Sequence, residues 1–110
     1  EKRGYIFLNS TARQREALRR VMAVFIDILC QLNLSLEDNP DRRFFYLIDE
    51  WAALPAMSAM TKLIHEGRSK GAALFLLFQN VAQAMTTYGE STAQSIVDAA
   101  STYVIFRAND

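Results

Sequence analysis

A run of five apolar residues, Phe44 to Ile48, leads directly into two adjacent carboxylates, Asp49 and Glu50. An unbroken apolar run of this length predicts a strand buried on both faces, and such strands belong to parallel sheets covered by helices. The carboxylates would then lie at the carboxyl end of the strand, the edge where open α/β sheets bind ligands. This stretch therefore restricts the chain to the α/β class.

The acidic pair has two interpretations that this stretch alone leaves open. Asp49 and Glu50 could end a Walker B strand of a nucleoside triphosphatase, in which the Asp serves the magnesium ion and the Glu polarises the attacking water. Alternatively, they could simply begin a solvated loop, because aliphatic strands that end in Asp are common in α/β proteins.

Composition limits the possible functions without identifying one. The 110 residues suit one domain or part of one, and the 51% apolar and 22% charged fractions exclude a disordered chain. Because 12 basic and 12 acidic residues give zero net charge, binding to nucleic acid or anionic lipid would need a local patch or an assembly. The single cysteine, Cys30, excludes an internal disulfide and is predicted to be a buried core residue.

The two ends of the sequence suggest a piece of a longer protein. The chain opens with Glu1-Lys2-Arg3 directly before a predicted strand and stops at Asp110 shortly after another. Its densest apolar stretch, from Val21 to Cys30, is interrupted by Asp27 and is too short to span a bilayer. We therefore expect any membrane anchor to lie outside these residues.

The rest of the chain alternates between short apolar runs and helical patterns, which predicts a parallel sheet with right-handed crossovers and flanking helices. The first predicted helix is so apolar that we expect it to be buried on more than one side. The predicted strands span 4–8, 44–48, 72–78 and 102–106, and the predicted helices span 12–33, 56–66, 81–88 and 91–100.

Short local signals predict where three of these helices begin or end. Thr11 with Gln14, and Ser91 with Gln94, have the spacing of a capping box, in which the first side chain bonds the free amides of a helix. Gly89 can end the helix before it in a left-handed conformation.

Parallel connectivity places Gln79, which follows the third predicted strand, at the same edge as Asp49 and Glu50. The two strand ends would lie about 5 Å apart if the strands are neighbours, or about 10 Å apart with one strand between them. Gln79 could then contact a terminal phosphate and the water near Glu50, although a simple polar strand end is the alternative.

Arg68 lies in the basic turn Gly67–Gly71, which parallel connectivity places at the opposite edge, about 23 Å away for a strand of seven residues. It cannot readily serve its own site, but it could act on a neighbouring subunit as an arginine finger. The alternative is a solvated turn, or a cation that caps the preceding helix. None of the four glycines belongs to a G-x-x-x-x-G-K-[ST] phosphate loop, so we expect this chain alone to be catalytically inactive.

Five stretches in fixed order resemble the nucleotide-binding domain of type IV secretion coupling proteins, the TraD/TraG-like conjugation ATPases. The resemblance covers nearly the whole chain, although Trp51 and Pro55 stand where the family often has Phe and Gly. The stretches are GYIFLNSTARQREALRRVMAVFIDIL, LIDEWAALP, HEGRSKGAALFLLFQNVAQ, TTYGES and VIFRAND.

The resemblance implies that residues 1–110 are the C-terminal part of a RecA-like P-loop NTPase core whose Walker A half lies outside the chain. It implies a homo-hexamer, anchored in the bacterial inner membrane by a segment outside this chain, that uses ATP and Mg²⁺ on the cytoplasmic face. Such a motor would couple DNA, as a relaxase–DNA complex, to secretion channel proteins. In this family Asp49 would hold the magnesium-bound water, Glu50 would activate water, Gln79 would sense phosphate, and Arg68 would be the finger offered to the next subunit.

Two other functions remain open at this point. Another hexameric DNA translocase, of the chromosome-segregation or end-processing type, would share the same acidic edge and the same ring. A non-catalytic α/β module, or a remnant that serves as a scaffold, would use Asp49 and Glu50 only to bind a metal or a partner.

Overall fold

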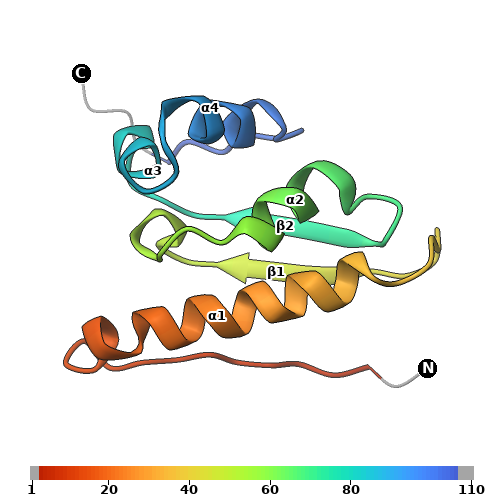
Figure 1. The fold of residues 1–110 in the computed structure, drawn as a ribbon, viewed down its shortest axis with the longest axis horizontal. Helices are drawn as coiled ribbons and strands as arrows, with labels where there is room; N and C mark the ends of the chain where they lie inside the picture. The colour runs from red at the N-terminus through yellow and green to blue at the C-terminus, as the bar shows by residue number, and fades with distance from the viewer. Residues whose placement is uncertain (1–2, 107–110) are drawn as a thin grey trace.

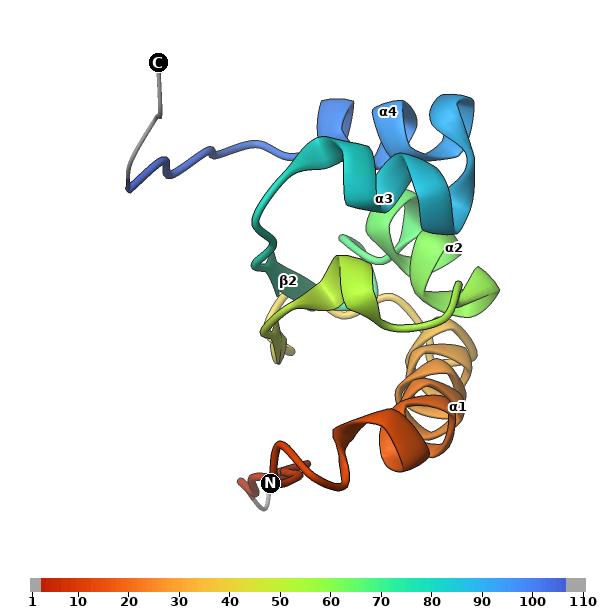
Figure 2. The ribbon, with the colours of Figure 1, turned by 90° about the vertical axis from the view of Figure 1, so that its left-hand side faces the viewer.

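The computed structural model describes residues 3–106 of the chain. Two parallel strands lie side by side, and Figure 2 shows the helices gathered on one side of them. The other face of the sheet is not covered by any helix of the described residues. The elements are α1 (Arg15–Leu34), β1 (Phe44–Ile48), the 3-10 helix η1 (Trp51–Ala53), α2 (Ser58–Glu66), β2 (Ala72–Leu76), α3 (Val81–Tyr88) and α4 (Glu90–Asp98) (Figure 1).

The register of the sheet is parallel, and it runs from Phe44 opposite Ala72 to Ile48 opposite Leu76. The hydrogen-bond ladder continues past the strands, because the Leu77 amide donates to the Ile48 carbonyl over 3.0 Å. The prediction of a parallel sheet with flanking helices is confirmed. Of the two spacings left open for the strand ends, the structure has the neighbouring arrangement, because β1 pairs directly with β2.

The core lies between the sheet and the helices. Cys30 of α1 is fully buried, as predicted, and its burial raises the pKa of the thiol to about 12. Trp51, which follows the acidic pair, is also fully buried. The largest buried side chains come from four separate segments of the chain: Trp51, Met57, Met60, Leu63 and Cys30.

Two polar side chains of α1, Asn33 and Asp27, fix the helix against its neighbours through part-buried hydrogen bonds. The Tyr46 hydroxyl donates to Asn33 Oδ1 over 3.2 Å, and Asn33 Nδ2 donates to the Lys70 carbonyl over 3.1 Å. Asp27 Oδ1 accepts from the Ala59 amide over 2.9 Å, so a side chain of α1 caps the start of α2. These bonds satisfy groups that would be costly to bury alone.

The sheet has fewer strands than we predicted. Residues 4–8 and 102–106 form no strand and are largely exposed, with Phe7 87% accessible. A strand exists only when its backbone groups pair with a neighbour, and neither run pairs with β1 or β2 here. Residues 107–110 of the VIFRAND motif lie outside the described residues.

The prediction that the 44–48 strand is buried on both faces is wrong for this structure. Phe45 is 64% exposed and Leu47 73% exposed, because the face that carries them has no covering helix. The first helix likewise buries one side, while Val21, Val24 and Ile28 remain exposed on the other.

The α3 helix spans the predicted residues 81–88, and α2 ends at Glu66 as predicted, but the other helix ends differ from their predicted positions. The Thr11 hydroxyl bonds the Gln14 side chain, not a free amide, and α1 begins at Arg15. Ser91 lies inside α4, which begins at Glu90 without a side-chain cap, so both predicted capping boxes are wrong. Gly89 does separate α3 from α4 with a positive φ of 84°.

Candidate functional site

The acidic pair lies in a tight turn directly after β1. Both Asp49 and Glu50 are exposed, and Glu50 has a left-handed backbone with φ 50° and ψ 39°. Asp49 Oδ1 accepts from the Glu50 amide over 3.0 Å, and the Glu50 carbonyl accepts from the Ala53 amide over 2.9 Å. The turn therefore presents two carboxylates on a backbone that is fixed on both sides.

Gln79 follows the neighbouring strand at the same end of the sheet. The Trp51 amide donates to the Leu77 carbonyl over 2.9 Å, which ties the segment after β1 to the segment after β2. Asn80 then starts α3, because its Oδ1 accepts from the Gln83 amide over 2.9 Å. The structure thus brings Gln79 and the acidic pair to one edge, with Gln79 between a strand and a capped helix.

An aromatic cluster, which the sequence reasoning did not anticipate, supports this edge from beneath. The buried Trp51 ring stacks on Tyr88 of α3 with centroids 5.1 Å apart and meets Phe78 edge-on at 5.5 Å. Offset and edge-to-face aromatic pairs contribute beyond their buried area. The cluster therefore joins both strand ends to α3, immediately below the exposed polar groups.

A basic residue that the sequence reasoning also missed reaches the site from α1. Arg15 Nη1 lies 3.2 Å from Glu50 Oε2. The signal was present in the sequence, because a helix that follows a parallel strand begins at the carboxyl edge of the sheet. Applied to α1, this rule would have placed its first turn beside the acidic pair.

Arg68 lies at the opposite end of the sheet, as parallel connectivity predicted. The turn Gly67–Gly71 meets the start of β1, where the Phe44 amide donates to the Gly71 carbonyl over 2.8 Å. Because β1 and β2 are five residues long, the sheet separates Arg68 from the acidic pair by about 17 Å, less than the seven-residue estimate. Arg68 cannot contact the carboxylates of its own chain.

The loop before β1 holds this turn in place. Asp38 accepts from Lys70 Nζ over 2.8 Å and from Ser69 Oγ over 2.9 Å, and the Asn39 amide donates to the Ser69 carbonyl. Two hydrogen bonds hold the pKa of Asp38 below its usual value: the bond from Lys70 has the larger effect, and the bond from Ser69 the smaller one. The Arg68 side chain is exposed, and the side chains of the next two residues, Ser69 and Lys70, are both bonded to Asp38.

The acidic pair suits a hard cation that is shared with other oxygen ligands. Mg²⁺ usually takes one or two carboxylates together with phosphates and water, and Asp49 and Glu50 offer such oxygens at an open edge. Within residues 3–106, no group of three or more His, Cys, Asp or Glu side chains is placed to hold a metal.

Two surface hollows of about 270 and 380 Å³ lie beside α1 and the segment around Pro55, and neither is lined by Asp49, Glu50 or Gln79. The candidate site is an exposed edge of the sheet, since Asp49, Glu50 and Gln79 are all exposed. In the part of the chain that the structure describes, no helix has the length and hydropathy to cross a membrane.

The fold and this edge define a parallel α/β protein with an exposed pair of carboxylates directly after β1, at the carboxyl end of its sheet. A family model described as the type IV secretion-system coupling protein DNA-binding domain matches residues 1–110, so the chain belongs to this family. The resemblance found in the sequence is thereby confirmed.

The chain spans only a small part of the length of the relatives that it matches. It is 28% identical over 108 residues to the coupling protein TraD of Escherichia coli (strain K12), covering 98% of this chain and 15% of TraD. Structures of the plasmid coupling protein TrwB with a non-hydrolysable GTP analogue, and with ADP and Mg²⁺, each match with TM-score 0.77 and 28% identity. Each match covers 82% of this chain and 22% of TrwB, which supports the RecA-like α/β assignment.

Proposed function

We propose that the whole protein is an ATP-driven motor of conjugative DNA transfer and type IV secretion, and that residues 1–110 are the C-terminal part of its nucleotide-binding domain. The observation that carries the proposal is the convergence of Asp49, Glu50 and Gln79 at one edge of a parallel sheet. Its support from outside the chain is the TrwB structure with ADP and Mg²⁺, together with the family of the chain.

Each polar group at the edge has a separate task in this proposal. Glu50 accepts a hydrogen bond from the attacking water, and Gln79 contacts the terminal phosphate. Asp49 orients water bound to Mg²⁺, which would supply positive charge against the phosphate oxygens. Since the sequence has no phosphate loop, the nucleotide would be held by residues beyond this chain, and the chain alone is expected to be inactive.

Arg68 would complete the site of the adjacent subunit in a homo-hexamer. Because strands of five residues, about 17 Å long, separate Arg68 from its own acidic pair, we propose that Arg68 acts on the phosphate across a subunit boundary. The contacts of Asp38 with Ser69 and Lys70 support this role, because they fix the turn that presents Arg68.

The family of the chain supports a proposal about the partners of the whole protein. We propose that the assembled ring binds DNA, delivered as a relaxase–DNA complex, and passes it to secretion channel proteins. The ring would be anchored at the cytoplasmic face of the bacterial inner membrane by a segment outside residues 1–110. A net charge of zero is compatible with DNA binding by local patches of the ring.

The glutamate is the most direct residue to test. In the full-length protein, Glu50→Gln should lower ATP turnover by at least about a hundredfold and leave nucleotide binding intact, because the amide cannot take the proton of the attacking water. Glu37→Gln, an exposed glutamate beyond the other end of the sheet, is the matched control and should turn over normally. Normal turnover by Glu50→Gln would remove Glu50 from the catalytic assignment and favour a non-catalytic module.

A further inference from the structure

The contact between Arg15 and Glu50 joins two segments that are 35 residues apart in the sequence. Arg15 is the first residue of α1, and Glu50 follows β1. The atoms in contact are Arg15 Nη1 and Glu50 Oε2, 3.2 Å apart. The start of α1 is therefore placed against the carboxylate to which the proposed function assigns the attacking water.

The backbone of Glu50 is held in one conformation, so the orientation of its side chain is what can vary. Within residues 3–106 Glu50 is the one non-glycine residue with positive φ, a conformation that persists only where surrounding contacts impose it. Hydrogen bonds from its own amide to Asp49 Oδ1 and from the Ala53 amide to its carbonyl supply those contacts. What remains to be fixed is the rotamer of the carboxylate.

The geometry of the pair indicates that Arg15 orients the Glu50 carboxylate more than it neutralises the carboxylate charge. Arg15 approaches Oε2 through Nη1, and no residue described here hydrogen-bonds to Oε1. A bidentate Arg–carboxylate pair would occupy both oxygens. The observed contact fixes one oxygen and leaves the other available to a water molecule.

The exposure of the pair argues against a mainly structural purpose. The Arg15 side chain is 54% exposed and that of Glu50 45% exposed. Ion pairs this exposed contribute little to stability, because solvent screens them and two long side chains lose rotamer freedom. A role in positioning can therefore be separated from a role in folding by experiment.

We propose that Arg15 is a positioning residue that holds the Glu50 carboxylate in the orientation needed to activate water. The inference rests on the proposed ATPase function. Loss of the contact returns a flexible carboxylate to several rotamers, and small misplacements of a catalytic group lower the rate without altering substrate binding.

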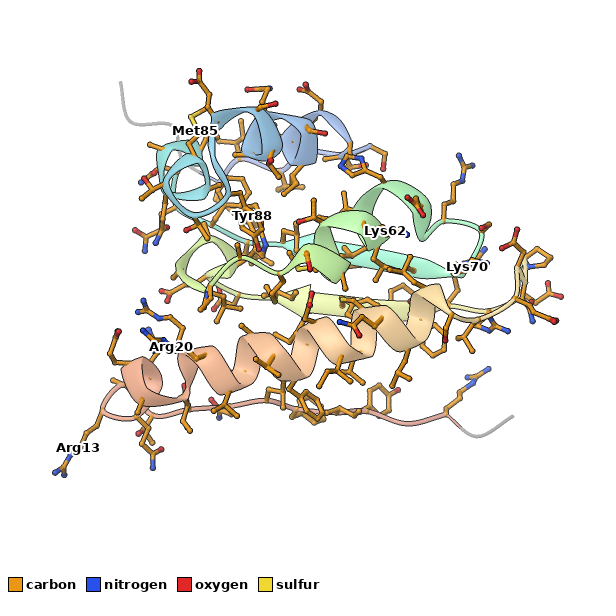
Figure 3. All side chains as sticks on the ribbon, viewed as in Figure 1. Arg13, Arg20, Lys62, Lys70, Met85 and Tyr88 are labelled. Atoms are coloured by element: carbon orange, nitrogen blue, oxygen red, sulfur yellow. The ribbon has the colours of Figure 1, made fainter. Side chains whose placement is uncertain are left out.

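The test is ATP turnover by the full-length protein without DNA, comparing wild type with Arg15→Ala, Arg15→Gln and Arg15→Lys. Arg13→Ala is the matched control, because Figure 3 shows Arg13 pointing away from the body of the chain. We expect kcat to fall about tenfold in Arg15→Ala and Arg15→Gln, with KM and melting temperature unchanged. Arg15→Lys should recover part of the rate, since an ammonium group can contact one carboxylate oxygen.

An unchanged kcat would overturn the inference, and so would an equal loss in Arg13→Ala. A raised kcat would also overturn it, because Arg15 would then restrain Glu50. A lower melting temperature that accounts for the lost activity in both Arg15→Ala and Arg15→Gln would make the residue structural. Glu50→Gln, run in parallel, separates the two proposals. If it turns over normally, the ATPase assignment fails; if it is inactive while Arg15→Ala matches wild type, only the positioning role fails.

Discussion

The two ends of the β1–β2 sheet are built by different physical means. The carboxyl end rests on packed aromatic rings, with Trp51 buried beneath an exposed acidic turn. The amino end rests on hydrogen bonds and a glycine: Asp38 bonds Ser69 and Lys70, and Gly71 fits against the Arg42 carbonyl. Acidic groups stand at one end and a basic turn at the other.

The difference shows how a short chain can expose an acidic pair and a basic side chain, Arg68, that cannot contact each other within the same chain. Aromatic packing supports the acidic turn, in which Asp49 Oδ1 accepts from the Glu50 amide and Glu50 Oε2 contacts Arg15. Within residues 3–106, the second oxygen of each carboxylate accepts no hydrogen bond and can face a ligand. Asp38 binds the side chains of Ser69 and Lys70, so Arg68 is the side chain of this basic turn that remains available to another molecule. The acidic end of the sheet in one copy of the chain is then suited to contact the basic turn of the next copy.

Removal of the aromatic support should have the largest effect on stability. Trp51→Ala empties the space beneath the acidic turn and should destabilise this chain by about 3–5 kcal/mol, the range for large buried aromatic side chains. Leu47→Ala, on the open face and 73% exposed, should cost under about 1 kcal/mol. Denaturant unfolding of both variants checks the contrast, and equal losses would show that the open face is packed in solution.

The glycine at the amino end should have the next largest effect. In Gly71→Ala the new Cβ would lie 2.3 Å from the Arg42 carbonyl oxygen at φ 82°, so we expect a loss of roughly 2–3 kcal/mol. Gly89→Ala meets open space at a similar φ of 84° and should lose only about 1 kcal/mol. The melting temperatures of the two variants separate these effects, because Gly71→Ala combines backbone strain with a steric clash whereas Gly89→Ala has backbone strain alone. A Gly71→Ala protein as stable as Gly89→Ala would refute the close approach.

The carboxylate that holds the basic turn should give the smallest effect, with a defined pH dependence. The pKa of Asp38 is lowered from 3.8, chiefly by the hydrogen bond from Lys70, so its stabilising contribution is present above pH 3.8. The contribution is lost as the pH falls through the lower pKa of the folded state. Amide hydrogen exchange of Asn39, whose amide bonds the Ser69 carbonyl, should be slower in wild type than in Asp38→Asn at neutral pH. The two rates should converge in acid; a constant ratio at all pH values would exclude the charge of Asp38 as the cause.

The sequence predicted the parts of the fold that depend on local pattern. The apolar runs before Asp49 and before Gln79 became neighbouring parallel strands, and the buried Cys30 followed from its apolar surroundings. The outer runs, 4–8 and 102–106, carry the same apolar signal but found no backbone partner in this structure. Strand propensity alone does not create a sheet, because pairing is a property of the neighbour as well.

The candidate site was predicted where residue type and strand order determine position, and missed where side chains meet across the fold. Asp49, Glu50 and Gln79 follow from the rule that parallel strands share a carboxyl edge. The same rule applies to the start of α1, but the choice of Arg15 as the side chain that contacts Glu50, like the stacking of Trp51 on Tyr88, depends on how helices pack on the sheet. Sequence spacing does not encode such packing, since the partners are more than 30 residues apart.

The central claim is that the acidic end of one chain and the basic turn of the next form a single ATPase site. Mixing full-length Arg68→Ala subunits with Glu50→Gln subunits tests it most directly, because each variant alone should be inactive while some mixed interfaces hold one intact acidic pair and one intact Arg68. We predict that ATP turnover reappears in the mixture and is highest near equal proportions. Turnover that stays at the level of the separate variants at every ratio would contradict a site shared between subunits.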